Sequence, residues 1–256
     1  MSNYSFLITV VGVGGTGTFV LKELSRFLEY YIPQNPNTDI HLACVDGDTV
    51  EYKNMERQCF SESDIAQNKA VCFAEAVNEC FPNVGLQSFP FYLYETSDIQ
   101  KIFESLNSQA EYSSEKLNIL IGCCDNHRCR QVMDKFFHET KSIIYIDAAN
   151  EFSKGEVVTG WRKNGKTMAP PRSHYFPGIL KSREKKAGTS CGTINKSKPQ
   201  HIATNMLAAN VVLSRLFPLF TAHKISPGIV YFDTFAGDMV AKEAFANESE
   251  QEKVPV

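Results

Sequence analysis

Glycines and an acidic residue near the start of the chain have the types and spacing that can hold a nucleotide. Four glycines lie between a short apolar run and a segment of helical periodicity: Gly12, Gly14, Gly15 and Gly17. In that context glycines let the backbone turn tightly and approach an anion, while amide groups at the helix start point at it. Asp46 ends the next apolar run, where a carboxylate can accept hydrogen bonds from ribose hydroxyls. These residues predict a nucleotide site and, on their own, favour NAD and ATP about equally.

Charged and amide side chains farther along favour a triphosphate over a dinucleotide. Beyond the second apolar run come, in order, Asp48, Asn54, Arg57, Gln58 and Lys69. A dehydrogenase has no need of Arg57 and Lys69 in that place. A triphosphate does, because guanidinium and ammonium groups neutralise its oxygens and stabilise the charge on a departing pyrophosphate. A surface ion-pair network is the plainer explanation, and we rank it lower because these groups follow the glycine loop in order.

A divalent cation would need oxygen ligands beside the phosphates. Asp125 and Asn126 directly follow an apolar run at 117–124. In a doubly wound sheet the carboxyl ends of the strands form the ligand crevice. We therefore expect Asp125 to bind Mg²⁺, with Asp48 as a further candidate ligand, and Asn126 to contact the nucleotide beside it.

Alternating strands and helices have to position these groups. Strands are predicted at 6–11, 40–46, 84–93, 117–124 and 142–148, with helices between them. Farther along we expect a strand at 155–162, a loop at 166–188, a long helix from 202 that Pro218 ends, and a hairpin of strands at 229–234 and 239–244. The predicted fold is α/β, Rossmann-like and doubly wound: a mostly parallel sheet with helices on both faces and a C-terminal antiparallel hairpin.

Length and composition fit one globular domain. The 256 residues are 43% hydrophobic and 21% charged, with a net charge of −3, so the chain can bury a core. No run reaches the roughly 18 continuous apolar residues of a membrane span, and residues 1–4 lack the charged region of a signal peptide. We expect a cytoplasmic protein with a single domain at 1–246 and a polar tail at 247–256.

The eight cysteines include no Cys-x-x-Cys pair. We therefore expect neither a structural zinc site of that kind nor a disulfide framework. Cys44, Cys72, Cys80 and Cys123 fit the core, because a free cysteine behaves as a small buried hydrophobe.

Four ordered motifs in residues 6–130 carry a family resemblance. They are Gly-x-Gly-Gly-x-Gly, Asp-x-Asp-x-Val-Glu-x-x-Asn-x-x-Arg-Gln, Asn-Lys and Asp-Asn-x-x-x-Arg. Together they resemble the ThiF/MoeB/HesA family, which has the adenylating fold of ubiquitin-activating enzymes. The second half is similar, more narrowly, to the ThiF-family protein of PRTRC plasmid systems, through Ser190, Cys191, Gln200, Asn205, Ala208 and Ala209.

The resemblance implies ATP-dependent adenylation of the C-terminal carboxylate of a ubiquitin-like β-grasp protein, with release of pyrophosphate. By position, the residues that it assigns to ATP and Mg²⁺ are Gly14, Gly15, Asp46, Asn54, Arg57, Lys69 and Asp125. It implies that Arg130 braces the loop of Asp125. It also implies a homodimer, with a JAB-type protease in the same pathway.

A basic segment surrounds Cys191. Residues 160–200 hold ten lysines and arginines against one acid, Glu184, a net charge of +9. By resemblance, its part at about 166–195 is the crossover loop that guides the partner's C-terminal tail to ATP, and we favour an acidic protein partner over nucleic acid. Nearby cations lower a thiol pKa, which would help Cys191 to form a thioester with the activated partner. A loop cysteine without a catalytic role is equally well supported.

Three rival functions stay open. An NAD-binding Rossmann oxidoreductase would use the same glycine loop. A non-catalytic module would bind nucleotide or the β-grasp protein without forming an adenylate. A related enzyme would activate a small molecule or a tRNA base carbonyl. The second rival gains weight because many relatives have an N-terminal helix whose arginine reaches the ATP of the opposite subunit, whereas this chain starts a few residues before its first strand.

Overall fold

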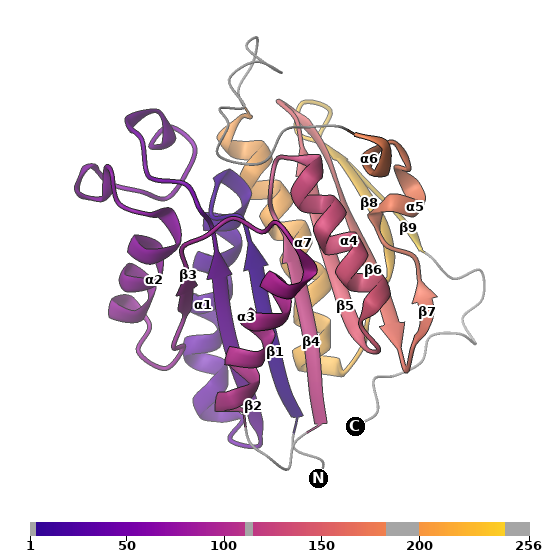
Figure 1. Ribbon diagram of the computed structural model, residues 1–256. Helices are drawn as coiled ribbons and strands as arrows, with labels where there is room; N and C mark the ends of the chain where they lie inside the picture. The colour runs from indigo at the N-terminus through magenta and orange to yellow at the C-terminus, as the bar shows by residue number, and fades with distance from the viewer. Residues whose placement is uncertain (1–3, 111–114, 183–199, 244–256) are drawn as a thin grey trace.

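A nine-stranded sheet runs through the computed structural model, which describes residues 4–110, 115–182 and 200–243 (Figure 1). The strands are β1 (Tyr4–Val11), β2 (Thr38–Val45), β3 (Gln87–Phe89), β4 (Glu115–Gly122), β5 (Ile143–Asn150), β6 (Lys154–Lys163), β7 (Lys166–Ala169), β8 (Gly228–Asp233) and β9 (Asp238–Glu243). The helices are α1 (Gly15–Gln34), α2 (Lys69–Cys80), α3 (Thr96–Gln109), α4 (His127–Glu139), α5 (Arg172–Tyr175), α6 (Gly178–Lys181) and α7 (Ile202–Ala222), and the 3-10 turns are η1 (Tyr52–Asn54) and η2 (Glu62–Asp64). The strand order is β3-β2-β1-β4-β5-β6-β8-β9, with β7 on β6.

The parallel half of the sheet comprises β3, β2, β1, β4 and β5. Val11 of β1 pairs with Val45 of β2 and with Gly122 of β4, so these three strands end at the same level. The glycine loop, Asp46 and the segment of Asp125 therefore leave the sheet at one edge. This is the edge where a doubly wound sheet binds its ligands.

Helices cover both faces of the sheet, and alternating residues of each central strand supply two cores. Phe6, Ile8 and Val10 of β1 belong to the core that contains α1, α2 and α7. Leu7 and Val11 belong to the core with α3 and α4, which lie in front of the sheet in Figure 1. A parallel strand between two helical layers needs apolar residues on both sides. The predicted doubly wound α/β fold is confirmed.

Antiparallel strands extend the sheet beyond β5. β6 pairs with β5 and β8, and β9 pairs with β8 to form the predicted C-terminal hairpin. Asp233 of β8 pairs with Asp238 of β9, and the turn between them includes Gly237 at a φ of +71°. Glycine adopts that left-handed conformation without steric cost.

The strand predicted at 84–93 and the loop predicted at 166–188 differ from the structure. The strand expected at 84–93 is reduced to β3, because Pro90 follows it directly and lacks the N–H that a strand ladder needs. The segment at 166–188, predicted as a loop, contains β7, α5 and α6. Asn164 and Gly165 turn the chain from β6 into β7 with positive φ values of 51° and 82°. An Asn-Gly pair of this kind is a hairpin signal that the loop prediction overlooked.

α7 continues past the proline that was predicted to end it. Pro218 lies inside the helix, which ends at His223 in a left-handed conformation. Leu216 and Phe220 are buried on either side of Pro218, and this burial offsets the hydrogen bond that a proline cannot donate. By length and apolar composition alone α7 is a candidate membrane span, the one such helix in the described residues. It packs on β5, β6 and α1 as part of the core.

Candidate functional site

The glycine loop lies between the ends of β1, β2 and β4. The N–H of Gly12 donates to the carbonyl oxygen of Val45 at 2.9 Å, and the N–H of Cys123 donates to that of Val11 at 2.7 Å. Gly12 has a φ of +92°, and a Cβ there would lie 2.9 Å from the carbonyl oxygen of Cys123. Only glycine fits this position, so the first glycine of the motif is required by the way the three strand ends meet.

The other glycines of the loop differ in their surroundings. A Cβ at Gly17 would lie 1.8 Å from the carbonyl oxygen of Gly12, and one at Gly15 would lie 2.3 Å from the amide nitrogen of Asn205. The backbone contact requires glycine at position 17, whereas an added Cβ at position 15 would have to displace the buried side chain of Asn205. A Cβ at Gly14 would meet no described atom within 4 Å. Packing within the described chain does not explain Gly14, whereas close approach of a phosphate would.

Asp46 holds the glycine loop as well as standing at the predicted ribose position. Its Oδ2 accepts from the N–H of Val13 at 2.7 Å, and its Oδ1 accepts from the N–H of Asp48 at 2.8 Å. Burial raises the pKa of the Asp46 carboxyl, against the opposing effects of the Lys69 charge and these hydrogen bonds. Each carboxylate oxygen has a second lone pair that can accept from a hydroxyl. The loop-holding role was missed by sequence reasoning.

Lys69 begins α2 with its side chain buried. Asn68 caps the helix by accepting N–H groups of the first turn, and its Nδ2 donates to the carbonyl oxygens of Asp46 and Asp48 at 2.9 and 3.1 Å. Nζ of Lys69 lies 3.4 Å from Oδ2 of Asp48. The structure therefore brings Lys69 to the two carboxylates. The capping role of Asn68 was not predicted, although an asparagine before an apolar helix is a recognised start signal.

The residues between Asp48 and Lys69 that were predicted to contact phosphates are partly used by the fold. Asn54 is buried, and its Oδ1 accepts from the N–H of Glu51 at 2.8 Å. Gln58 is buried, and its Oε1 has no hydrogen-bond partner among the described residues. Arg57 is half-buried, and its carbonyl oxygen accepts from Asn205 at 3.4 Å. Because buried polar atoms normally find partners, the Gln58 amide is the one of these groups that most needs a ligand or water.

A chain of polar side chains ties the glycine loop to the second half of the protein. Thr16 Oγ1 donates to Oδ1 of Asn150 at 3.0 Å, and Nδ2 of Asn150 donates to Oδ1 of Asn205 at 2.8 Å. Gln200 donates to the carbonyl oxygen of Asn150 at 2.9 Å. Since Asn150 ends β5 and Asn205 lies in the first turn of α7, these bonds fix α7 against the loop. Nothing in the sequence spacing links the three positions.

Asp125 is exposed in the turn between β4 and α4. The next residue, Asn126, caps α4, with its Oδ1 accepting from the N–H of Cys129 at 2.7 Å. Asn126, which was predicted to bind the cofactor, therefore uses its side-chain oxygen to cap α4. The Asp125 carboxylate stands beside that start and is accessible to solvent.

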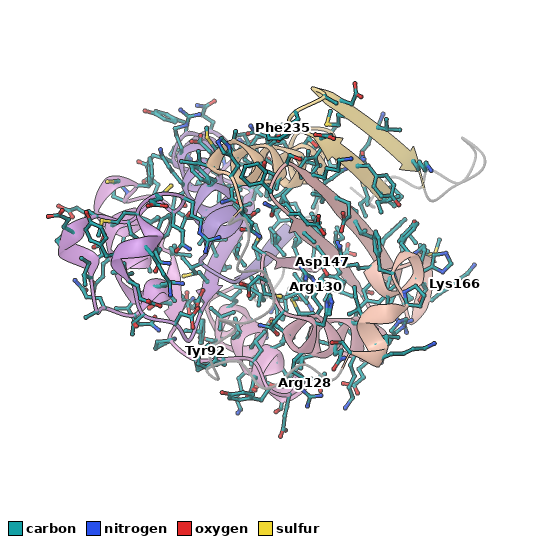
Figure 2. All side chains as sticks on the ribbon, turned by 90° about the horizontal axis from the view of Figure 1, so that it is seen from above. Tyr92, Arg128, Arg130, Asp147, Lys166 and Phe235 are labelled. Atoms are coloured by element: carbon teal, nitrogen blue, oxygen red, sulfur yellow. The ribbon has the colours of Figure 1, made fainter. Side chains whose placement is uncertain are left out.

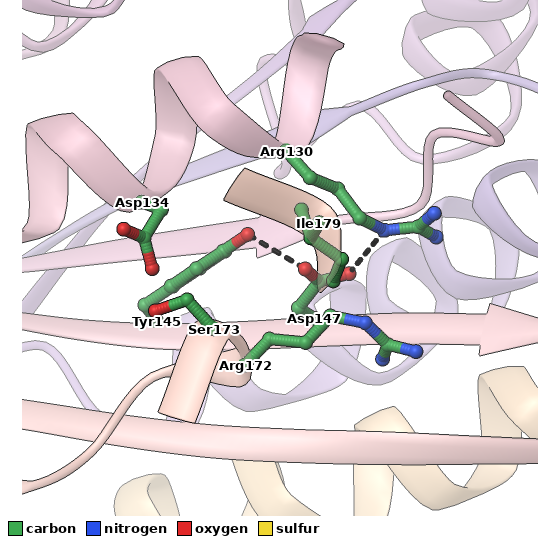
Figure 3. Close-up of a pocket in the computed structure, with 7 residues that line it drawn as sticks. All are labelled: Arg130, Asp134, Tyr145, Asp147, Arg172, Ser173 and Ile179. Carbon is green, nitrogen blue, oxygen red and sulfur yellow. Dashed lines mark hydrogen bonds and ion pairs between the residues drawn. The ribbon is translucent and has the colours of Figure 1, made fainter. Parts of the chain in front are cut away.

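A buried ionic cluster supports this turn (Figure 3). Nε of Arg130 lies 3.3 Å from Oδ1 of Asp147, whose Oδ2 accepts from the hydroxyl of Tyr145 at 2.7 Å. Arg130 also donates to the carbonyl oxygen of Cys124 at 2.6 Å, directly before Asp125. Arg130 thus occupies the position of a brace, the role that the resemblance implied for it.

Arg172 of α5 lines the same small pocket as Arg130 and Asp147 (Figure 3). It is buried, pairs with Glu156, and stacks its guanidinium 4.6 Å from the ring centre of Phe176. Arg172 belongs to the segment that the sequence pattern predicts as a basic loop, and its burial corrects that prediction. Gln131 of α4 donates to the carbonyl oxygen of Ile179 at 2.8 Å. The segment that follows β7 is therefore anchored on α4, the helix that starts beside Asp125.

Asp48 and Asp125, the two carboxylates predicted as Mg²⁺ ligands, differ in what contacts their oxygens. Oδ1 of Asp48 accepts from the hydroxyl of Tyr92 at 2.6 Å, and its Oδ2 faces Lys69. In the described part of the chain, no group of three or more His, Cys, Asp or Glu side chains could hold a metal ion. A Mg²⁺ bound through nucleotide phosphates needs only one or two protein carboxylates. The accessible Asp125 fits that role better than Asp48 does.

The cysteines divide into buried and exposed positions. Cys44 and Cys72 are buried as predicted, and Cys123 is half-buried. Cys80 is exposed, so its assignment to the core was wrong: it is the last residue of α2, where the chain turns back toward solvent. Cys191, the crossover-loop residues 183–195 and the tail at 247–256 lie outside the described residues.

Comparisons with known proteins give a consistent picture. The ubiquitin-like modifier-activating enzyme 5 of Arabidopsis thaliana is 24% identical over 141 residues, which make up 53% of this chain and 30% of that protein. The enzyme of the same name from Oryza sativa subsp. japonica is 24% identical over 136 residues, 52% of this chain and 30% of its own. The matched region thus spans under a third of these relatives.

Solved structures match over nearly the whole chain. PaaA has a TM-score of 0.61 at 15% identity, with 95% of this chain and 65% of PaaA covered. E. coli MccB with ATP has a TM-score of 0.60 at 14% identity, with 97% and 65% covered. At such identities these structures show a shared fold. The ThiF family matches residues 4–252, from the glycine loop through the C-terminal hairpin, and this chain belongs to the ThiF family.

Proposed function

We propose that this protein uses ATP to adenylate the C-terminal carboxylate of a ubiquitin-like β-grasp protein. The observation that carries the proposal is the convergence of four features at one edge of the sheet: the glycine loop that is open at Gly14, the Asp46 carboxylate, the Lys69 ammonium and the accessible Asp125. The glycine loop and Lys69 suit the phosphates of ATP. Asp46 suits the ribose, and Asp125 suits a Mg²⁺ bound to the nucleotide.

The chemistry needs little more than position and charge. An oxygen of the substrate carboxylate attacks the α-phosphorus, the bond to the bridging oxygen of the β-phosphate breaks, and pyrophosphate leaves with the electron pair. The carboxylate is already ionised near neutral pH, so no protein base is required. Lys69 and Arg57 would stabilise charge on the phosphates, and Asp125 would hold Mg²⁺, which supplies further charge neutralisation when bound.

The comparisons support a polypeptide as the substrate. The curated relatives are named ubiquitin-like modifier-activating enzymes, and MccB has been solved with ATP and together with MccA. A polypeptide C-terminus presents a single free carboxylate on an extended chain.

The test is exchange of labelled pyrophosphate into ATP in the presence of small β-grasp proteins encoded beside this one. We expect exchange that depends on such a partner, that is lost when the partner's last two residues are removed, and that falls at least about tenfold in Lys69→Ala, which removes a charge-assisted contact. No exchange with any such neighbour, while the protein is folded and binds ATP, would remove the proposal. In the same mixtures, transfer of the activated carboxyl to Cys191 would appear as a thiol-sensitive adduct, and an adduct that persists in Cys191→Ala excludes that step.

A further inference from the structure

Tyr92 lies in the loop between β3 and α3, at the edge where the parallel strands end (Figure 2). Its hydroxyl donates to Oδ1 of Asp48 at 2.6 Å. Its ring packs on the backbone of Gly47, where an added Cβ would lie 2.6 Å from the ring carbons. The ring therefore covers the backbone between Asp46 and Asp48, the two carboxylates of the nucleotide site.

Asp48 divides its two oxygens between Tyr92 and Lys69. Its Oδ2 lies 3.4 Å from Nζ of Lys69, whose side chain is 8% exposed, whereas the side chain of Asp48 is 53% exposed. A buried ammonium needs a counter-charge that is held in place. Because Asp48 is open to solvent on its outer side, its orientation depends on the hydrogen bond from Tyr92.

The surroundings of Tyr92 favour its protonated phenol, which is the donor of this hydrogen bond. Burial raises its pKa above the ordinary value for tyrosine, and the hydrogen bond to Asp48 and the negative charges of Asp48 and Asp46 raise it further.

We propose that Tyr92 is a positioning residue for the nucleotide: it fixes Asp48, and through Asp48 it holds the Lys69 ammonium where the triphosphate binds. This inference rests on the proposed function, because it takes Lys69 to meet ATP. It also assigns different roles to the two acidic residues Asp48 and Asp125. With both oxygens engaged, Asp48 serves as the counter-charge of Lys69, and Mg²⁺ is left to Asp125.

The first test is Tyr92→Phe, which removes the hydroxyl and leaves the ring on Gly47. We expect the KM for ATP in pyrophosphate exchange, and the Kd for ATP, to rise about fivefold, the effect of losing one hydrogen bond to a partly exposed charged group. The kcat should stay within about twofold, because Lys69 itself is kept. Tyr94→Phe, an aromatic hydroxyl removed two positions along the same loop, is the matched control and should leave both constants unchanged.

A double-mutant cycle then separates positioning from a general structural effect. Asp48→Asn should also weaken ATP binding, and Tyr92→Phe added to Asp48→Asn should cause no further loss, because both changes break one link. Additive losses in the double variant would overturn the inference, as would a lowered melting temperature with an unchanged KM. If Tyr92→Phe binds ATP as tightly as the unmodified protein, the inference fails and the proposed function stands. If the unmodified protein does not bind ATP, the proposed function itself fails.

Discussion

Asp46 and Asn126 show how single polar atoms serve the fold and the site together. Asp46 accepts two backbone N–H groups that shape the glycine loop, and Asn126 spends its oxygen on the first turn of α4. Such bonds fix the backbone in the absence of a ligand. The polar side chains that are not used in this way can therefore contact a ligand without rearrangement of the backbone. Electrostatic stabilisation of a reaction is most effective when its groups are held in advance in this way.

Gly14 and Gly15 give a matched pair of substitutions at this scale. Gly14→Ala adds a Cβ into open space, and because Gly14 is the N-cap of α1, where alanine is poorer than glycine, it should lower the free energy of unfolding by no more than about 1 kcal/mol. Because that Cβ would occupy the place of a phosphate, ATP affinity should fall at least about tenfold. Urea unfolding and ATP titration measure the two effects.

Gly15→Ala should show the opposite pattern in stability. Its Cβ meets the Asn205 amide at 2.3 Å and must displace it, which should cost about 1–3 kcal/mol. If Gly14→Ala binds ATP normally, the open side of the loop is not a phosphate site. If Gly15→Ala is as stable as the unmodified protein, the contact with α7 is not a constraint.

Several element starts are set by side-chain caps, and Asp98 at α3 shows the consequence for pH. Its Oδ2 accepts from the N–H groups of Tyr94 and Glu95 at 3.0 and 3.1 Å. Partial burial on its own would raise the pKa of Asp98, but these two N–H groups and Lys101 hold it below the ordinary value. An acid with a lowered folded pKa stabilises the fold above its unfolded pKa, and that contribution is lost as the pH falls through the folded value.

We therefore expect Asp98→Ala to lower the free energy of unfolding by about 1 kcal/mol at pH 7, the usual value of a helix cap. The difference from the unmodified protein should shrink as the pH falls below about 4, where the unfolded carboxyl takes up its proton. Urea unfolding over a pH series measures it, with Asp98→Asn as a control that keeps an acceptor oxygen. A difference that stays constant over the series would mean that the charge on Asp98 has no part in the cap.

The order of the elements was predictable, and their bounds were predictable only in part. Apolar runs that end in glycine or aspartate placed β1, β2 and β4 and their shared edge, because burial on both faces leaves a plain signal. The short β3 and the turn at Asn164 depend on backbone details that hydrophobic pattern does not report. The sequence pattern predicts a helix end at Pro218, but the burial of Leu216 and Phe220 carries α7 through it.

The candidate site was predictable as a set of residue types but not as a set of bonds. The motifs located Asp46, Lys69 and Asp125, and the strand register then brought them together. The partners of these residues come from distant segments, such as Tyr92 from the loop after β3 and Asn205 from α7. Contacts of that kind depend on how strands pair and helices pack, which spacing along one sequence does not encode.

At the scale of the whole molecule, the two halves of the sheet have separate tasks that meet at the end of β5. The parallel half carries the candidate nucleotide site, and the antiparallel half with α7 is tied to it through Thr16, Asn150 and Asn205. The segment of α5 and α6 is anchored on α4, the helix that follows Asp125 in the chain. A substrate chain that reaches ATP along this edge would therefore touch both halves.

We propose that this edge of the sheet binds ATP in preference to a dinucleotide. Equilibrium titration of the full chain with ATP and Mg²⁺, and separately with NAD, by calorimetry distinguishes the two. We expect ATP to bind at least about tenfold more tightly than NAD, and Lys69→Ala and Arg57→Ala each to remove about tenfold in ATP affinity while the protein stays folded. Binding of NAD at least as tight as that of ATP, and unchanged in both variants, would contradict it.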